Sequence, residues 1–196
     1  MWEAISNFGD AALTLPVALI CAVWALSSNR QLAFRWVLCL GAGMALVGTT
    51  KILYAGCGIE ATELDFRVIS GHTMLSTSVW SVALAMVFQS VGRSRWIGAA
   101  IGLLVGAITG VARVCDHAHS APEVIIAWLV GVLVVYVVLQ WRWKFEPHSR
   151  CRRIAAVALV LVSSLAYGHH APIQNMIDTR SPYICAVVRS AVSSMF

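Results

Sequence analysis

Ionisable side chains are concentrated in one stretch, from Arg113 to Glu123, which lies between two long apolar runs. The stretch contains a cation, two imidazoles and two carboxylates. Charged groups at a membrane boundary are costly without partners or water, so such residues are functional candidates. His119 and Glu123 are one helical turn apart, and an imidazole oriented by a carboxylate is the general signature of an activated nucleophile.

A second polar cluster lies upstream, at the entry to another apolar run. It contains Arg67, Ser70, Gly71 and His72. Ser70 fits a helix N-cap, with His72 in the first turn, and the free amides and positive dipole end of a helix start favour an anion. Together the two clusters suit phosphoryl transfer, where catalysis consists mostly of positioning and of stabilising charge.

Each of these residues also has an ordinary structural explanation. Ser120 and Glu123 match a capping box, and Ser70 and Gly71 are common at helix starts. Lys51 follows an apolar run, where a lysine more often extends to the membrane interface than turns inward to bind an anion. The spacing alone therefore leaves structural and functional roles open.

The elements that position these clusters are predicted to be membrane helices. The 196-residue chain is 59% hydrophobic and 12% charged, with a mean hydropathy of +0.78. A span needs about 20 apolar residues, and in lipid a single apolar segment must be helical to satisfy its backbone. We predict an all-α bundle of six transmembrane helices forming a single domain over residues 1–196. The spans are residues 11–28, 33–53, 72–91, 96–113, 122–141 and 152–168.

The lysines and arginines predict the orientation of the bundle. Nine of them fall in the loops after the first, third and fifth spans, and five fall on the other side. Because cytoplasmic loops collect these residues, both polar clusters should face outward. The cations are scattered over membrane-flanking loops without an aromatic-rich groove pattern, so we expect no nucleic-acid partner.

The cysteines predict a disulfide only as one of several pairings. Cys57, Cys115 and Cys185 lie on the outer side, where two of them could pair in an oxidising compartment. The chain has no CxxC or Cys/His spacing of the zinc type, so we predict no metal and no other cofactor. After the last span, Ser181-Pro182 predicts the start of a short amphipathic helix on the membrane.

The two clusters resemble motifs of the type 2 phosphatidic acid phosphatase superfamily of integral membrane lipid phosphatases. The third motif of that family, Arg-x5-His-x3-Asp, is matched by Arg113, His119 and Glu123, with Glu in place of Asp. The spacing selects His119 over His117, because His119 is six residues after Arg113 and four before Glu123.

The two other motifs match less completely. The second motif, Pro-Ser-Gly-His, is matched by residues 70–72, with Ile69 in place of Pro. The first motif, Lys-x6-Arg-Pro, retains Lys51, but Gly58 and Ile59 stand where its Arg-Pro pair belongs. Arg67 is a candidate to replace the missing arginine.

The resemblance implies a role for each matched residue. His119 would attack phosphorus, Glu123 would hold its ring in the reactive tautomer, and His72 would protonate the leaving oxygen. The residues implied to bind the substrate phosphate are Arg113, Ser70, Gly71, Lys51 and Arg67.

The implied function is a membrane lipid phosphatase with a phosphohistidine intermediate. It would hydrolyse a phosphomonoester or diphosphate of a lipid such as undecaprenyl diphosphate or phosphatidic acid, on the periplasmic side of a bacterial inner membrane. Two alternatives remain open: a lipid phosphotransferase that uses the same site, and a non-catalytic scaffold that binds a lipid headgroup.

Overall fold

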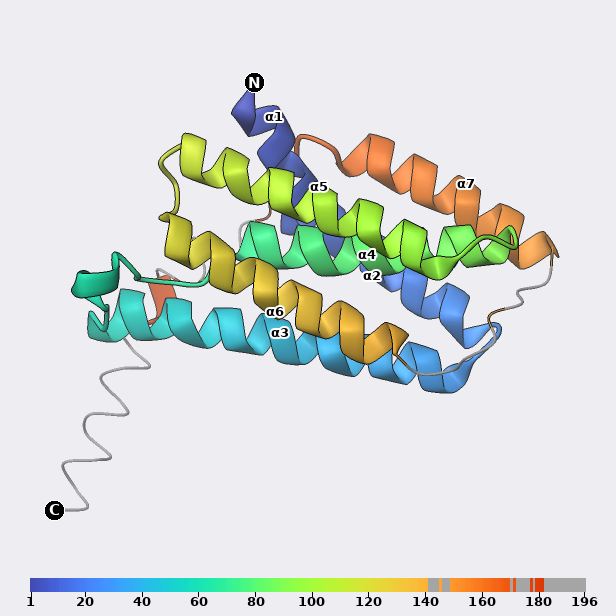
Figure 1. Ribbon diagram of the computed structural model, residues 1–196, viewed down its shortest axis with the longest axis horizontal. Coiled ribbons are helices and arrows are strands. Elements are labelled where there is room, and N and C mark those ends of the chain that lie inside the picture. Colours follow the sequence, from blue (N-terminus) through green and yellow to red (C-terminus); the bar gives the residue numbers. More distant parts are fainter. Residues whose placement is uncertain (141–144, 146–148, 170, 172–176, 178, 182–196) are drawn as a thin grey trace, which may run out of the picture.

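The computed structural model describes residues 1–140, 145, 149–169, 171, 177 and 179–181, and this part of the chain is an all-helical bundle (Figure 1). The predicted all-α fold is confirmed. The elements are α1 (Trp2–Ser6), η1 (Asn7–Gly9), α2 (Ala11–Leu26), α3 (Arg30–Cys57), η2 (Thr62–Leu64), α4 (Gly71–Ser90), α5 (Arg95–Cys115), α6 (Ala121–Leu139) and α7 (Ser149–Ala166).

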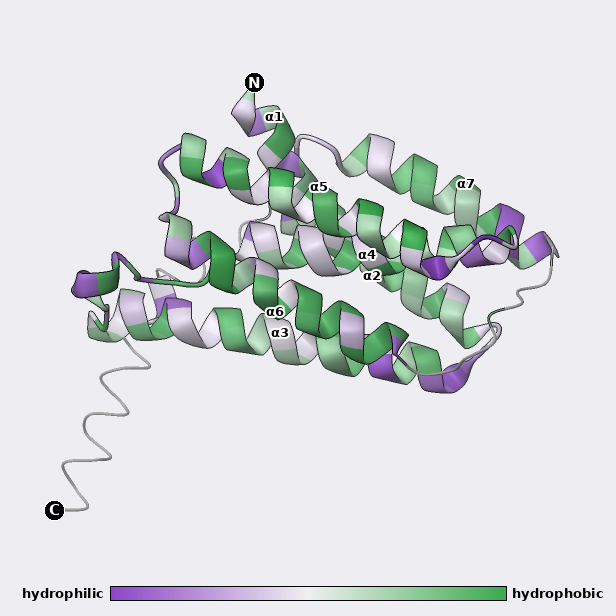
Figure 2. Ribbon diagram, viewed as in Figure 1, coloured by the Kyte–Doolittle hydropathy of each residue, from purple (hydrophilic) through white to green (hydrophobic). Residues whose placement is uncertain are grey.

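Five segments among the described residues are long and apolar enough to cross a membrane. They are Trp2–Leu26, which joins α1 to α2, and the helices α3, α4, α5 and α6. Hydrophobic residues run along these helices, whereas hydrophilic residues gather near their ends (Figure 2). The sixth predicted span corresponds to α7, which packs beside α2. Three arginines in its first five residues leave it a shorter uncharged stretch than any of these five segments has.

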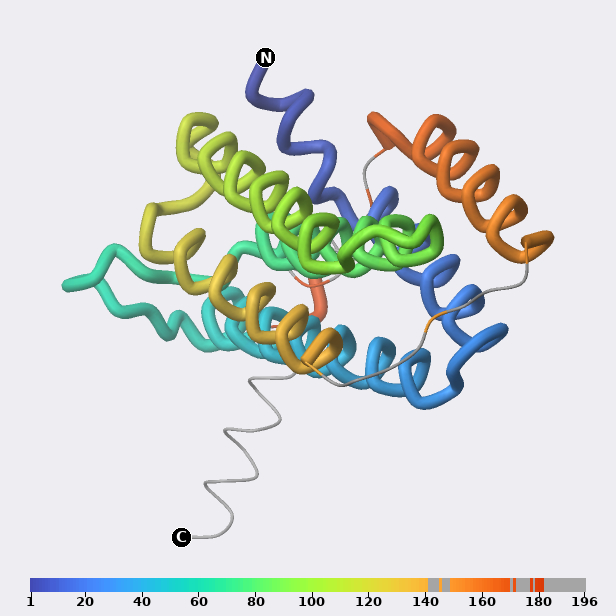
Figure 3. Tube along the Cα trace, turned by 45° about the vertical axis from the view of Figure 1, so that its right-hand side comes forward, coloured from blue at the N-terminus to red at the C-terminus, as the bar shows by residue number. Residues whose placement is uncertain are grey.

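Helix α4 is the centre of the bundle, in contact with α2, α5 and α6 (Figure 3). Small residues allow this close packing. A Cβ atom on Gly106 of α5 would lie 2.6 Å from Thr77 Cα, and one on Gly131 of α6 would lie 2.6 Å from Thr77 Cβ. Thr77 satisfies its buried hydroxyl within α4 by donating to the Thr73 carbonyl. Because glycine has no side chain at these two contacts, α5 and α6 can pack closely against α4.

The alternating direction of the helices brings the starts of α2, α4 and α6 to the same end of the bundle as the ends of α3 and α5. Helix α3 ends at Cys57, and Gly58 after it adopts the left-handed conformation (φ +67°) that commonly ends helices. The loop from Gly58 to Ser70 then crosses to α4 and carries η2. Both polar clusters predicted from the sequence lie at this end.

Of the three cysteines predicted to lie on the outer side, one is in a disulfide and one is free. Cys57 is disulfide-bonded, and Cys115 has an exposed free thiol. Cys185 lies outside the described residues, as does the continuation beyond Ser181 of the helix predicted to begin there.

Candidate active site

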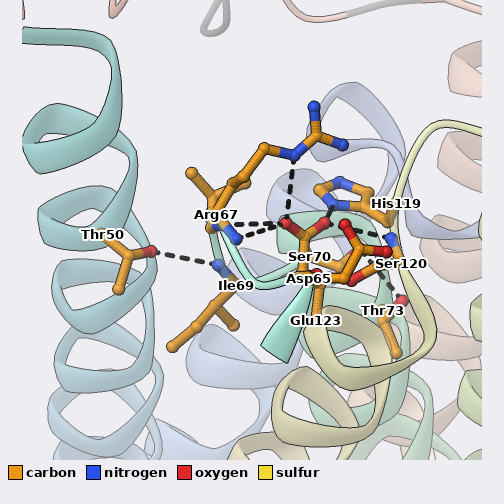
Figure 4. A network of polar contacts seen from close by, with 10 residues as sticks. Thr50, Asp65, Arg67, Ile69, Ser70, Thr73, His119, Ser120 and Glu123 are labelled. Atoms are coloured by element: carbon orange, nitrogen blue, oxygen red, sulfur yellow. Dashed lines mark hydrogen bonds and ion pairs between the residues drawn. The ribbon is translucent and has the colours of Figure 1, made fainter. Parts of the chain in front are cut away.

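The carboxylate of Glu123 is the centre of the polar network at this end of the bundle. Its side chain is 1% exposed. Oε1 accepts hydrogen bonds from the backbone amides of Arg67 (2.8 Å) and Val68 (3.1 Å), and Oε2 accepts one from the amide of Ser120 (3.2 Å). Oε2 also lies 2.6 Å from Nδ1 of His119. Figure 4 shows this carboxylate between the loop at Arg67 and the ring of His119.

These contacts determine which nitrogen of His119 carries a proton. An ionised carboxylate only accepts hydrogen bonds, so at 2.6 Å Nδ1 must be the donor. In the neutral ring, Nε2 then has the free lone pair. The capping box predicted for Ser120 and Glu123 is present, and the carboxylate also orients the imidazole. Glu123 therefore makes the capping contacts and the contact with His119 at the same time.

The environment of His119 favours its neutral form. Burial lowers the pKa of the imidazole from 6.5 to about 4. The hydrogen bond to Glu123 opposes this shift, while the positive charges of Arg113 and Lys51 add to it. At neutral pH the ring is therefore uncharged, as a nucleophile must be.

A cavity of about 470 Å³ opens beside this network. Six of the predicted residues that line it carry ionisable side chains: Lys51, Arg67, His72, Arg113, His119 and Glu123. Residues from two clusters more than 40 positions apart in the sequence thus meet around one space. The lining also includes the apolar side chains of Met44, Val47 and Leu75.

Three cations of the predicted set face the cavity from different elements. Lys51 extends from the last turns of α3 toward the start of α4, and its Nζ would lie 3.9 Å from a Cβ atom on Gly71. Arg113 donates from Nη1 to Ser6 Oγ (3.1 Å), and its buried Nε–H has no acceptor among the described residues. The Nε of Arg67 lies 3.7 Å from Glu123 Oε1. A hydrogen bond with Tyr54 and the charge of Glu123 raise the pKa of Arg67, which is therefore positively charged.

Helix α4 begins where the sequence predicts, but Ser70 does not line the cavity. Ser70 is the N-cap residue, and Gly71 and His72 line the cavity. Ser70 itself is fully buried and is not part of the lining, and its hydroxyl accepts a hydrogen bond from Thr73 Oγ1 (3.1 Å). The amide of Ile69 donates to Thr50 Oγ1 (3.2 Å), a contact that proline cannot make.

Sequence reasoning missed the contribution of the N-terminal segment. Ser6 contacts Arg113, and Gly9 and Asp10 contact His72. The one available signal was the two acidic residues ahead of the first apolar run, Glu3 and Asp10. In the described part of the chain no group of three or more His, Cys, Asp or Glu side chains could hold a metal ion.

Comparison with known proteins assigns the family. A model of the PAP2 superfamily matches residues 32–147, more than half of the chain. The chain belongs to the PAP2 superfamily. An uncharacterized 22.5 kDa protein in the cps region of Klebsiella pneumoniae is also similar, with 33% identity over 185 residues, which are 90% of this chain and 88% of that protein. No solved structure matches the chain.

Membership of the PAP2 superfamily indicates phosphatase activity on lipid phosphates. The five apolar helices fit an integral membrane protein. All the residues that carry the second and third motifs lie inside the matched range, whereas Ser6, Gly9 and Asp10 precede it.

The Glu123 network predicts that shortening this side chain destabilises the protein. In Glu123→Asp the carboxylate retreats by about 1.5 Å, one carbon–carbon bond, and cannot reach the Arg67 and Val68 amides while holding His119. We expect the free energy of unfolding to fall by about 1–3 kcal/mol, because buried donors lose their acceptor. Thermal unfolding in detergent measures the change. Glu63→Asp, the same change in the exposed part of the loop, is the control, and equal stability of the two variants would contradict the network.

The environment of His119 predicts an unusual titration. The ring resonances, assigned by comparison with His119→Asn, should remain those of the neutral imidazole as the pH falls to about 5, and should shift near pH 4. Protonation is delayed because burial and the facing cations Arg113 and Lys51 disfavour the charged ring more than Glu123 favours it. Nuclear magnetic resonance of ¹⁵N-histidine-labelled protein measures the midpoint. A midpoint of 6 or higher would contradict this environment.

Proposed function

We propose that the chain is a membrane lipid phosphatase that hydrolyses a phosphomonoester or diphosphate of a lipid through a phosphohistidine on His119. The observation that carries the proposal is the bond from His119 Nδ1 to Glu123, which leaves Nε2 as the reactive atom beside a cavity lined by cations. A buried neutral imidazole held by a carboxylate suits nucleophilic attack. A cavity lined by cations suits a phosphate group.

In the first step Nε2 of His119 attacks phosphorus, and the bond between phosphorus and the leaving oxygen breaks. The imidazole becomes positively charged, and Glu123 stabilises this charge through Nδ1–H. His72, in its protonated form, gives a proton to the leaving oxygen. The leaving group departs as an alcohol, or as a lipid monophosphate when the substrate is a diphosphate.

In the second step water attacks the phosphorus of the phosphohistidine, and the phosphorus–nitrogen bond breaks. The now neutral His72 accepts the proton of the water, so both imidazoles return to their starting forms. Inorganic phosphate is the second product. General acid–base catalysis of this kind typically contributes about 10²–10⁴-fold to the rate.

The charge on the transferring phosphoryl group would be held by fixed donors. Arg113 offers a buried Nε–H without an acceptor among the described residues, and Lys51 and Arg67 face the same space. Gly71 offers its amide at the start of α4. A contact from Ser70 requires its hydroxyl to turn from Thr73 toward the cavity. In this proposal Arg67 takes the place of the arginine missing from the first motif.

The apolar part of the cavity supports a lipid substrate. Met44, Val47 and Leu75 line the same cavity as the cations, so a phosphate bound by the cations would leave its lipid chain against apolar side chains. The distribution of cations in the loops supports a site on the outer surface, which is periplasmic in a bacterial inner membrane. Undecaprenyl diphosphate and phosphatidic acid are examples of substrates that fit both features.

The proposal predicts that one histidine of a close pair is essential and the other is not. We expect His119→Asn to lower release of inorganic phosphate from a lipid diphosphate by at least about 10³-fold, because the nucleophile is lost. His117→Asn should retain wild-type activity, since His117 is exposed and does not line the cavity. Asparagine suits position 117, where φ is +54°. Purified protein in detergent, assayed for free phosphate, measures both.

The same assay separates the alternatives. With a ³²P-labelled lipid as substrate and a second lipid added as acceptor, a phosphotransferase would transfer the label to the acceptor and release little free phosphate. A scaffold would do neither. Normal phosphate release by His119→Asn would contradict the proposed nucleophile.

A further inference from the structure

The N-terminal segment from Ser6 to Asp10 forms one wall of the site, although it precedes the range matched by the family model. Ser6 accepts the hydrogen bond from Arg113, and Gly9 and Asp10 line the cavity. These contacts join residues more than 60 positions apart in the sequence. The segment therefore contributes to the site through contacts that the family motifs do not include.

Asp10 is buried and held in place by its own hydrogen bonds. It is 5% exposed and is the N-cap residue of α2. Its Oδ1 accepts from the amide of Ala12 (2.8 Å) and from the amide of Ala171 (3.1 Å). The other oxygen, Oδ2, lies 3.6 Å from Nε2 of His72. A carboxylate fixed in this way presents its charge to the imidazole at a defined position.

Gly9 holds the other side of this contact. A Cβ atom at this position would lie 2.8 Å from the carbonyl carbon of His72 and 2.9 Å from its Cβ. Real side chains do not approach so closely, so only glycine lets the segment pack against the start of α4. Asp10 is consequently placed next to the ring, and relative movement of the two is restricted.

We infer that Asp10 is a positioning residue for His72, orienting its ring and stabilising the protonated form that acts as the acid. This inference rests on the proposed function, in which His72 gives a proton to the leaving oxygen. Each imidazole of the site would then be backed by its own carboxylate, Glu123 for the nucleophile and Asp10 for the acid.

Asp10 is important for the charge on His72 because the other charged groups around the ring are positive. The charged groups that face the ring are Asp10, Arg113 and Lys51. A proton on His72 therefore meets two positive charges, and Asp10 is the negative charge that offsets them. Once the proton has been given up, the same carboxylate favours its return from water in the second step.

The variant Asp10→Asn separates charge from capping. Asparagine caps helices about as well as aspartate, so its oxygen can keep the bond from Ala12, while the charge beside His72 is lost. Asp10→Ser also caps and also lacks the charge. Thermal unfolding in detergent verifies that the variants are folded, and either one is sufficient for the test.

The experiment compares two substrates with the same alkyl chain: an alkyl phosphate, which has a poor leaving group, and an aryl phosphate, which has a good one. It measures kcat/KM, which covers the steps up to release of the leaving group. A good leaving group does not need the acid. We therefore expect Asp10→Asn to lose roughly 10-fold or more with the alkyl phosphate and less than about 3-fold with the aryl phosphate. His72→Ala should show the same dependence with a larger loss.

The outcomes distinguish this inference from the proposed function. An equal loss of Asp10→Asn on both substrates, or no loss on either, would overturn the role of Asp10 while His72→Ala still depended on the leaving group. If His72→Ala lost equally on both substrates, the acid role of His72 would be wrong and the inference would fall with it. If the wild-type protein hydrolysed neither of these substrates and released no phosphate from a lipid diphosphate, the proposed function itself would fail.

Discussion

The site depends on one buried carboxylate. Removing a carboxylate from water is costly unless hydrogen bonds compensate, and Glu123 receives them from backbone amides of two separate loops and from the ring of His119. These loops cannot move independently without leaving the charge unsatisfied. The same bonds explain why glutamate can stand where the family motif has aspartate. The longer side chain reaches across to the loop before α4 while it orients the imidazole, so one residue joins the two loops and sets the tautomer of His119, the proposed nucleophile.

The packing of α4 makes this arrangement possible. Glycines of α5 and α6 contact the backbone and small hydroxyl residues of α4, so the three helices approach closely. The start of α4 consequently lies beside the start of α6, and the loops that precede the two helices share the carboxylate. Helix α3 adds Lys51 from its last turns and Thr50, which fixes the backbone at Ile69. Apolar packing among the helices thus determines the positions of the polar groups at one end of the bundle.

The sequence predicts those features that depend on local spacing. Apolar run lengths located the helices, five of which among the described residues belong to membrane-length segments. The four-residue separation of His119 and Glu123 anticipated their contact. Contacts between segments far apart in the sequence could not be predicted from spacing. Nothing in the spacing indicates that Asp10 reaches His72, or that Ser6 pairs with Arg113, because the path of the N-terminal segment depends on packing against Gly9. The burial of Ser70 was also missed, since a helix N-cap can face either solvent or protein. Lys51 turns toward the cavity, although position alone favoured the interface, because α3 presents it beside the start of α4.

We propose that Glu123 occupies Nδ1 of His119 and leaves Nε2 to attack phosphorus. The most direct measurement is to quench the purified protein during turnover of a lipid phosphate and to identify the phosphorylated histidine and its linkage by mass spectrometry and ³¹P nuclear magnetic resonance. We expect a phosphoryl group on His119 attached through Nε2. A phosphoryl group attached through Nδ1, or carried by His72 in place of His119, would contradict it.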